Sequence, residues 1–162
     1  MTFSRLRGAA ARPAGRWDAR EAAMLDQIDH VGIACHDLKT AVAFYESVFD
    51  VTVASREVHE DQGVREAMLR LGEGPGGSWI QLLEPTGPDT PVGKFLARRG
   101  PGIHHIGYRV ANITETLDVI GARGVRLLHQ RPRHGSMGAS IAFLHPADVG
   151  GVLTELVQPP DR

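Results

Sequence analysis

The chain has 162 residues, of which 42% are apolar, and its formal net charge is −1 at pH 7. This length suits one domain, or two halves that share a core. The small net charge gives no electrostatic reason to expect nucleic acid or an anionic membrane as a partner, and no apolar run approaches the roughly 18 residues that a membrane-spanning helix requires.

Residues 1–23 differ in composition from the rest of the chain. They contain five arginines, many alanines and glycines, and little apolar periodicity. We expect a disordered N-terminal extension, or an upstream extension of a chain whose working start is Met24. The alternative is a targeting peptide for import into an organelle, which Asp18 and Glu21 weaken because such leaders are poor in acidic residues.

Residues 24–84 predict a strand, a helix and three further strands. Alternation around His30 predicts a strand over residues 26–35. Asp37 is a good helix N-cap, and apolar residues at helical spacing follow it as far as Val48. The remaining strands of this half are predicted over residues 51–58, 64–70 and 78–84.

The only cysteine, Cys35, closes the first predicted strand. An intrachain disulfide is therefore impossible, and a reducing compartment, the cytoplasm, is expected. We interpret Cys35 as a small buried apolar group, which is the usual behaviour of a free cysteine.

Residues 85–102 join the two halves through a proline-rich segment with a short helix predicted over 91–99. The second half, residues 103–158, then repeats the order of the first. Its elements are predicted as a strand over 103–110, a helix over 113–122, a strand over 125–130, a loop over 131–138 and strands over 139–145 and 151–157. Each half is therefore βαβββ.

Two histidines mark the repeat most clearly. His30 and His105 are 105 − 30 = 75 residues apart, and Gly32 falls on Gly107 at the same spacing. Self-similarity at a fixed spacing indicates a duplicated structural unit. A lone histidine on an apolar strand is usually a hydrogen-bonded core residue, but two in equivalent positions favour a shared site.

Each half also ends in an apolar strand with one polar residue at its centre. Gln81 follows His30 by 81 − 30 = 51 residues, and Glu155 follows His105 by 155 − 105 = 50. A pseudo-twofold axis between the halves would bring all four side chains together. Two imidazoles and two oxygen donors form a plausible set of ligands for a divalent metal ion.

This pattern resembles the vicinal-oxygen-chelate superfamily, also called glyoxalase-like, and within it the family of methylmalonyl-CoA epimerases. The match covers about residues 25–158, and the stretches that carry it are 29–34, 81–91, 102–108 and 143–156. The resemblance implies an α+β fold in which both modules form one domain over residues 24–158. In such a domain a cupped, mostly antiparallel eight-stranded sheet surrounds a metal site.

The resemblance also implies roles for individual residues. It makes His30, Gln81, His105 and Glu155 the ligands of one divalent metal ion, with Co²⁺ favoured and Mn²⁺, Zn²⁺, Ni²⁺ or Mg²⁺ as alternatives. Glu66 matches the catalytic carboxylate of the family. Its counterpart at an offset of 74 is Ser140, which is a weak acid, so Glu155 or a bound water is expected to serve the other face of the substrate.

The activity implied is epimerisation of (2R)- and (2S)-methylmalonyl-CoA by α-proton abstraction through a metal-stabilised enolate. The expected partners are a small-molecule acyl-CoA substrate and a second copy of the chain in a homodimer. One rival is a glyoxalase-like isomerase or thiol transferase, against which Glu66 and the neutral Gln81 argue. Another is a metal-free protein of this fold that sequesters a ligand, which would not need the full ligand set.

The other histidines are not expected to be ligands: His36, His59, His104, His129, His134 and His145. We expect His104 to point away from its neighbour His105, because successive side chains alternate between the faces of a strand. The loop over residues 131–138 is interpreted either as part of the site entrance or as a solvated hairpin loop.

Overall fold

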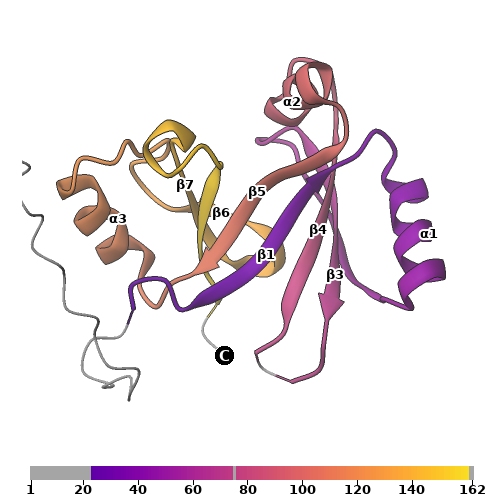
Figure 1. Cartoon of the computed structure of the whole chain (residues 1–162), viewed down its shortest axis with the longest axis horizontal. Helices are drawn as coiled ribbons and strands as arrows, with labels where there is room; N and C mark the ends of the chain where they lie inside the picture. The colour runs from indigo at the N-terminus through magenta and orange to yellow at the C-terminus, as the bar shows by residue number, and fades with distance from the viewer. Residues whose placement is uncertain (1–22, 75, 161–162) are drawn as a thin grey trace, which may run out of the picture.

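The computed structural model describes residues 23–74 and 76–160, which form one curled sheet of eight strands with three α-helices (Figure 1). The predicted α+β class is therefore confirmed. The expectation of disorder for residues 1–23 concerns a segment that, apart from Ala23, lies outside the described residues.

Each half supplies four strands and one helix, and a further helix joins the halves. The first half contains β1 (Gln27–Ala34), α1 (Leu38–Phe49), β2 (Val53–His59), β3 (Val64–Leu71) and β4 (Ser78–Pro85). The joining helix is α2 (Pro91–Arg99). The second half contains β5 (Gly102–Arg109), α3 (Ile113–Ala122), β6 (Arg133–His134), β7 (Ser140–Leu144) and β8 (Thr154–Gln158), with 3₁₀ turns η1 (Ser136–Gly138) and η2 (Pro146–Asp148).

The strand order β2-β3-β4-β1-β5-β8-β7-β6 places the first strand of each half at the centre of the sheet. β1 and β5 pair antiparallel with each other, and each pairs in parallel with the last strand of its own half. The other pairs are antiparallel. The sheet is therefore mostly antiparallel, as predicted, and the two halves are related about the β1–β5 pair.

Local side-chain chemistry fixes where the helices begin. Each helix is preceded by a residue whose side-chain oxygen accepts a backbone N–H of the first turn, which satisfies a donor without an intrahelical partner. The caps and their donors are Asp37 with Thr40, Thr90 with Gly93, and Asn112 with Glu115. The predicted helices begin and end as expected over 91–99 and 113–122.

Two apolar clusters lie beneath α1 and α3, which cover opposite outer sides of the curled sheet (Figure 1). Leu82 in the first cluster and Leu156 in the second are almost fully buried. Each directly follows a predicted metal ligand, Gln81 or Glu155. Because side chains alternate along a strand, the ligand candidates face the concave side, away from the helices.

Cys35 packs in the first cluster, which confirms its interpretation as a buried apolar group. Its thiol donates to the carbonyl oxygen of Leu83 at 3.5 Å. Burial, followed by the carboxylates of Glu84 and Asp37, raises the pKa of the thiol to about 11. A thiol with so little thiolate character is a poor nucleophile.

The strand predicted over residues 125–130 is wrong. The segment pairs with β7 at an isolated bridge between Leu127 and Leu144 and not in an extended ladder. The ladder does not extend because the N–H of Phe143 donates to the imidazole of His129 instead of to a backbone carbonyl. The fourth strand of this half, β6, lies instead within the predicted loop 131–138.

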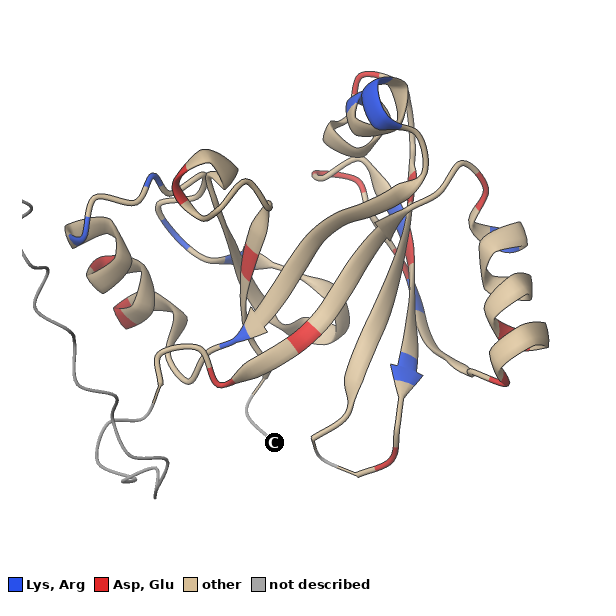
Figure 2. Ribbon diagram, viewed as in Figure 1, with Lys and Arg blue, Asp and Glu red and all other residues tan. Residues whose placement is uncertain are grey.

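Figure 2 shows acidic and basic residues interspersed over the described elements, in keeping with the net charge of −1. None of the helices in residues 23–74 and 76–160 combines the length and the apolar character needed to cross a membrane.

We expect Leu82→Ala and Leu156→Ala each to lower the free energy of unfolding by about 2–5 kcal/mol, because each would leave a cavity beneath a helix. Urea denaturation followed by circular dichroism measures the change. Leu25→Ala is the matched control, since Leu25 is 40% exposed, and it should cost less than about 0.5 kcal/mol. An equally small loss at Leu82 or Leu156 would contradict the assignment of two separate cores.

Candidate metal centre

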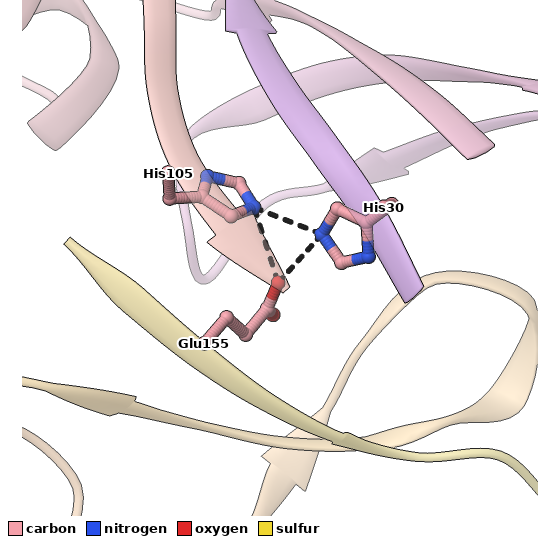
Figure 3. Close-up of side chains that lie close together, drawn as sticks. All are labelled: His30, His105 and Glu155. Carbon is pink, nitrogen blue, oxygen red and sulfur yellow. Dashed lines mark hydrogen bonds and ion pairs between the residues drawn. The ribbon is translucent and has the colours of Figure 1, made fainter. Parts of the chain in front are cut away.

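Three of the four predicted ligands converge at the centre of the concave face (Figure 3). The Nε2 atoms of His30 and His105 are 2.9 Å apart. Oε2 of Glu155 lies 2.8 Å from Nε2 of His30 and 3.1 Å from Nε2 of His105. All three side chains are buried, so these atoms form a compact triangle shielded from bulk water.

Strand register explains this convergence and places Gln81 on the same face. Gly107 of β5 lies directly opposite His30 on one side and Glu155 on the other. In the same way, Gly32 of β1 lies opposite His105 and Gln81. Residues directly opposite each other project their side chains from the same face, so the repeat brings both ligand pairs to one surface.

The two glycines make room for the imidazoles. A Cβ atom at Gly32 would lie 2.3 Å from the His105 ring, and one at Gly107 would lie 2.4 Å from the His30 ring. Any larger residue would therefore displace a ligand candidate. The close approach, and not backbone conformation, is the reason for glycine at these positions.

Gln81 is held by its amide nitrogen, which donates to Oε2 of Glu66 at 2.7 Å and to Oγ of Ser136 at 2.9 Å. Its carbonyl oxygen Oε1 is buried and has no hydrogen-bond partner among the described residues. Oε2 of Glu155 also accepts no well-aligned hydrogen bond, although two imidazole nitrogens lie beside it. Buried oxygens without partners are costly, and a cation would satisfy both.

The spacing of the donors fits a metal ion. Two donors about 2.1 Å from one cation, at right angles to each other, are about 3.0 Å apart. The three distances in the triangle are 2.8, 2.9 and 3.1 Å. His30, His105 and Glu155 could therefore occupy one face of a coordination polyhedron, with the free oxygen of Gln81 as a further donor.

The residue before each histidine fixes the orientation of its ring. Nδ1 of His30 lies 3.1 Å from Oδ1 of Asp29, and Arg109 donates two hydrogen bonds to the other carboxylate oxygen, Oδ2. Nδ1 of His105 lies 3.0 Å from Nδ1 of His104. A partner at Nδ1 leaves Nε2 to face the centre, as in metal sites where a second group orients a ligating imidazole.

The prediction that His104 points away from His105 is wrong, and the reason is a β-bulge. The pairing of β1 with β5 skips Asp29 in one strand and His104 in the other. A bulge interrupts the alternation of side chains, so each bulged residue can reach the ring that follows it. The two bulges occupy equivalent positions, because 104 − 29 = 75.

The buried cluster of His30, His105 and Glu155 favours a bound positive charge, as the pKa values of two of its members indicate. Burial opposes protonation of His30, but Glu155 and Asp29 outweigh it and raise the pKa of the imidazole to about 9. Burial also opposes ionisation of Glu155, yet the two imidazoles lower the pKa of its carboxyl to about 2. Burial and the adjacent His105 lower the pKa of His104 to about 4, so that ring is neutral. A divalent cation would replace the proton of His30.

Glu66 lies on β3 beside this centre and is buried. Besides its bond to Gln81, its Oε1 lies 3.2 Å from Nε2 of His59. The interpretation of Ser140 as the counterpart of Glu66 is wrong. Glu66 pairs with Leu83 and Ile141 pairs with Val157, two residues beyond Gln81 and Glu155, so the equivalent residue is Ile141.

A cavity of about 250 Å³ opens beside the centre. The residues that line it include Glu66, Gln81, His105 and Glu155. The loop predicted over residues 131–138 contributes to its wall through Arg133, Gly135 and Ser136. A buried carboxylate and the donor set therefore face one space large enough for a small acyl group.

The structure adds two residues to the site that the sequence analysis does not assign to it. His59 is predicted not to be a metal ligand, and the structure shows that it contacts Glu66. Glu57 and His59 share one face of a strand, and a short turn joins that strand to the strand that carries Glu66. This alternation in the sequence indicates that His59 and Glu66 can meet. Ser136 contacts Gln81 from a loop, and no spacing in the sequence indicated it.

Comparison with known proteins identifies consistent relatives. Residues 29–143 match the Glyoxalase/Bleomycin resistance protein/Dioxygenase superfamily. A methylmalonyl-CoA epimerase solved in complex with methylmalonyl-CoA and NH₄⁺ is 51% identical, with a TM-score of 0.81 over 83% of this chain and 95% of that one. A Streptomyces coelicolor methylmalonyl-CoA epimerase solved with 2-nitronate-propionyl-CoA is 50% identical, with a TM-score of 0.82 over 85% and 99%. The mitochondrial methylmalonyl-CoA epimerase of Homo sapiens is 35% identical over 83% of this chain and 74% of its own length.

Gly107→Ala should weaken binding of added Co²⁺ by at least about tenfold, because the new methyl group would overlap the His30 ring. Isothermal titration calorimetry measures the affinity. The control is Gly87→Ala, where an added Cβ meets nothing within 4 Å. Unchanged affinity in Gly107→Ala, with a native circular dichroism spectrum, would show that His30 does not contact the ion.

Proposed function

The chain belongs to the methylmalonyl-CoA epimerases of the Glyoxalase/Bleomycin resistance protein/Dioxygenase superfamily, to whose solved members it is about 50% identical, and we propose its reaction from this premise. The proposed reaction is the interconversion of (2R)- and (2S)-methylmalonyl-CoA. The observation that carries the proposal is the buried carboxylate of Glu66 beside the His30–His105–Glu155 cluster. The identity to epimerases sets aside the glyoxalase-like and thiol-transferase readings. The unsatisfied donor set argues against a metal-free sequestering protein.

The proposed ligands of one divalent cation are His30, Gln81, His105 and Glu155. The short donor distances, the orphaned oxygen of Gln81 and the need for positive charge support this assignment. Two imidazoles and two oxygens suit Co²⁺, Mn²⁺, Zn²⁺ or Ni²⁺ better than Mg²⁺, and the family resemblance favours Co²⁺. When bound, the cation supplies Lewis-acid stabilisation for the negative charge that develops on the thioester oxygen.

Glu66 is the proposed base for the C2 proton of the substrate. Gln81 donates to one of its carboxylate oxygens and His59 contacts the other, so the group is held in one orientation at the cavity wall. Preorganisation of this kind lowers the barrier because the base needs no reorientation when the substrate arrives. The neutral amide of Gln81 positions Glu66 without adding a second negative charge beside it.

Glu155 is the proposed acid–base group for the opposite face of C2. It lies on the other module, and Ile141 occupies the position equivalent to Glu66, so the second module offers no carboxylate there. The contacts of Glu155 with both imidazoles involve Oε2, which leaves Oε1 for the substrate. Its low pKa suits the role of a ligand and makes its carboxylate a weak base.

The cavity volume suits the malonyl part of an acyl-CoA, whose longer portion would extend out of the cavity. The resemblance further implies a homodimer, and the single cysteine, Cys35, favours a reducing compartment such as the cytoplasm. Both are proposals, and light scattering of the purified protein and fractionation of its source cells measure them.

Glu66→Gln should retain one equivalent of metal but lose about 10²–10⁴-fold in the rate of deuterium incorporation at C2 of methylmalonyl-CoA, because an amide cannot accept the proton. Nuclear magnetic resonance in deuterated water follows the exchange. Glu115→Gln, on the exposed first turn of α3, is the control and should exchange at the wild-type rate. Full exchange in Glu66→Gln would place the base elsewhere.

Apparent affinity for Co²⁺ should rise about tenfold per pH unit between about pH 7 and the His30 pKa of about 9, because each bound ion displaces one proton from His30. Above that pKa the proton is already absent and the affinity should level off. Cobalt absorption spectra recorded across this range give the affinity. A pH-independent affinity would show that His30 carries no competing proton.

A further inference from the structure

The hairpin formed by β2 and β3 places two carboxylates opposite each other. Glu57 and Glu66 are direct cross-strand partners, and such partners project from the same face. His59 lies two residues along from Glu57, and its Nε2 is 3.2 Å from Oε1 of Glu66 and 3.6 Å from Oε2 of Glu57. Two like charges in this arrangement would repel each other, and the imidazole between them offsets that repulsion.

These three side chains also form a gradient from the interior to solvent. The side chain of Glu66 is 3% exposed, that of His59 is 14% exposed and that of Glu57 is 31% exposed. The buried base therefore has a continuous polar path to water. His59 lies at the cavity wall, so the path begins at the place where a substrate proton would arrive.

Epimerisation with two acid–base groups creates a need for such a path. When a proton leaves one face of C2 and another is added to the opposite face, the first group ends the turnover protonated and the second ends it without its proton. The next turnover in the same direction requires both groups to exchange protons with solvent. This inference rests on the proposed function, in which Glu66 is one of the two groups.

We propose that His59 is the proton relay that resets Glu66 after each turnover. The protonated imidazole first releases one proton to water or to the carboxylate of Glu57. The neutral imidazole then accepts the proton of Glu66 at Nε2, which leaves Glu66 ionised and His59 protonated as before, so that proton and charge balance. Among the described residues, His59 contacts Glu66 and Glu57 and none of the proposed metal ligands, so it acts through Glu66.

The surroundings of His59 suit this role. Its charged neighbours are Glu66, Glu57 and Asp61, and Asp61 is itself paired with Arg133. The hydrogen bond to Glu66 is the largest influence on His59, and despite partial burial the carboxylates raise the pKa of its imidazole. Once Glu66 has taken up a substrate proton, that stabilising charge is gone, which favours release of the proton from His59 to solvent.

His59→Ala and His59→Gln test the relay. Glutamine keeps an N–H that can bond to Glu66 but cannot carry a proton. With pure (2R)-methylmalonyl-CoA, both variants should lose about 10–100-fold in steady-state turnover, while single-turnover conversion with enzyme in excess stays at the wild-type rate. Added imidazole should restore turnover in His59→Ala. His36→Ala, at an exposed position, is the control and should match the wild type.

Other results would overturn the relay. Wild-type turnover in His59→Gln but not in His59→Ala would mean that His59 only positions Glu66. An equal loss in single and multiple turnover would place its effect on the chemical step. The donor atoms of Glu57, His59 and Glu66 lie within 4.8 Å of one another, so loss of a second equivalent of Co²⁺ in His59→Ala would reveal a metal site instead. A wild-type protein without epimerase activity would remove the proposed function itself.

Discussion

The structure depends on one buried arrangement of charge. The carboxylate of Glu155 lies between two imidazoles, and all three side chains are buried. A negative charge in such a place is stable only beside a positive one, which protonated His30 supplies alone and a divalent cation would supply more strongly. Three features hold these side chains close together. They are the pairing of β1 with β5, the two glycines that leave room for the imidazole rings, and the hydrogen-bond partners at Nδ1 of each histidine.

The two halves share a scaffold but differ at the positions that face the cavity. Glu155 corresponds to Gln81, Glu66 to Ile141 and Asp29 to His104. The repeated elements, namely the histidines and the glycines opposite them, build the centre. The unequal positions place the proposed base, Glu66, on the first module and the proposed charged ligand, Glu155, on the second. Duplication therefore brings the two histidines together. Divergence between the copies makes the two sides of the cavity chemically different.

Much of this could be predicted from the sequence because spacing along a strand determines which side chains meet. The interval between His30 and His105, and the polar residue near the end of each half, sufficed to predict that His30, His105 and Glu155 lie together. The bulges at Asp29 and His104 could not be predicted, because they depend on how two strands pair. For the same reason, a constant sequence offset predicts Ser140 as the counterpart of Glu66, whereas the strand pairing shows that Ile141 is the counterpart. The contact of Ser136 with Gln81 depends on a loop that bears no periodic pattern.

The bulges have a consequence for the length of the chain. Each adds one unpaired residue to a central strand, and the side-chain period of a strand is two. If one residue were deleted at Asp29 or His104, the side chains of half of that strand would point to the opposite face of the sheet. The alternative is that this half shifts its register relative to the neighbouring strand. Insertions and deletions should therefore accumulate in turns such as the glycine-rich segment between β3 and β4, while β1 and β5 keep a fixed number of residues.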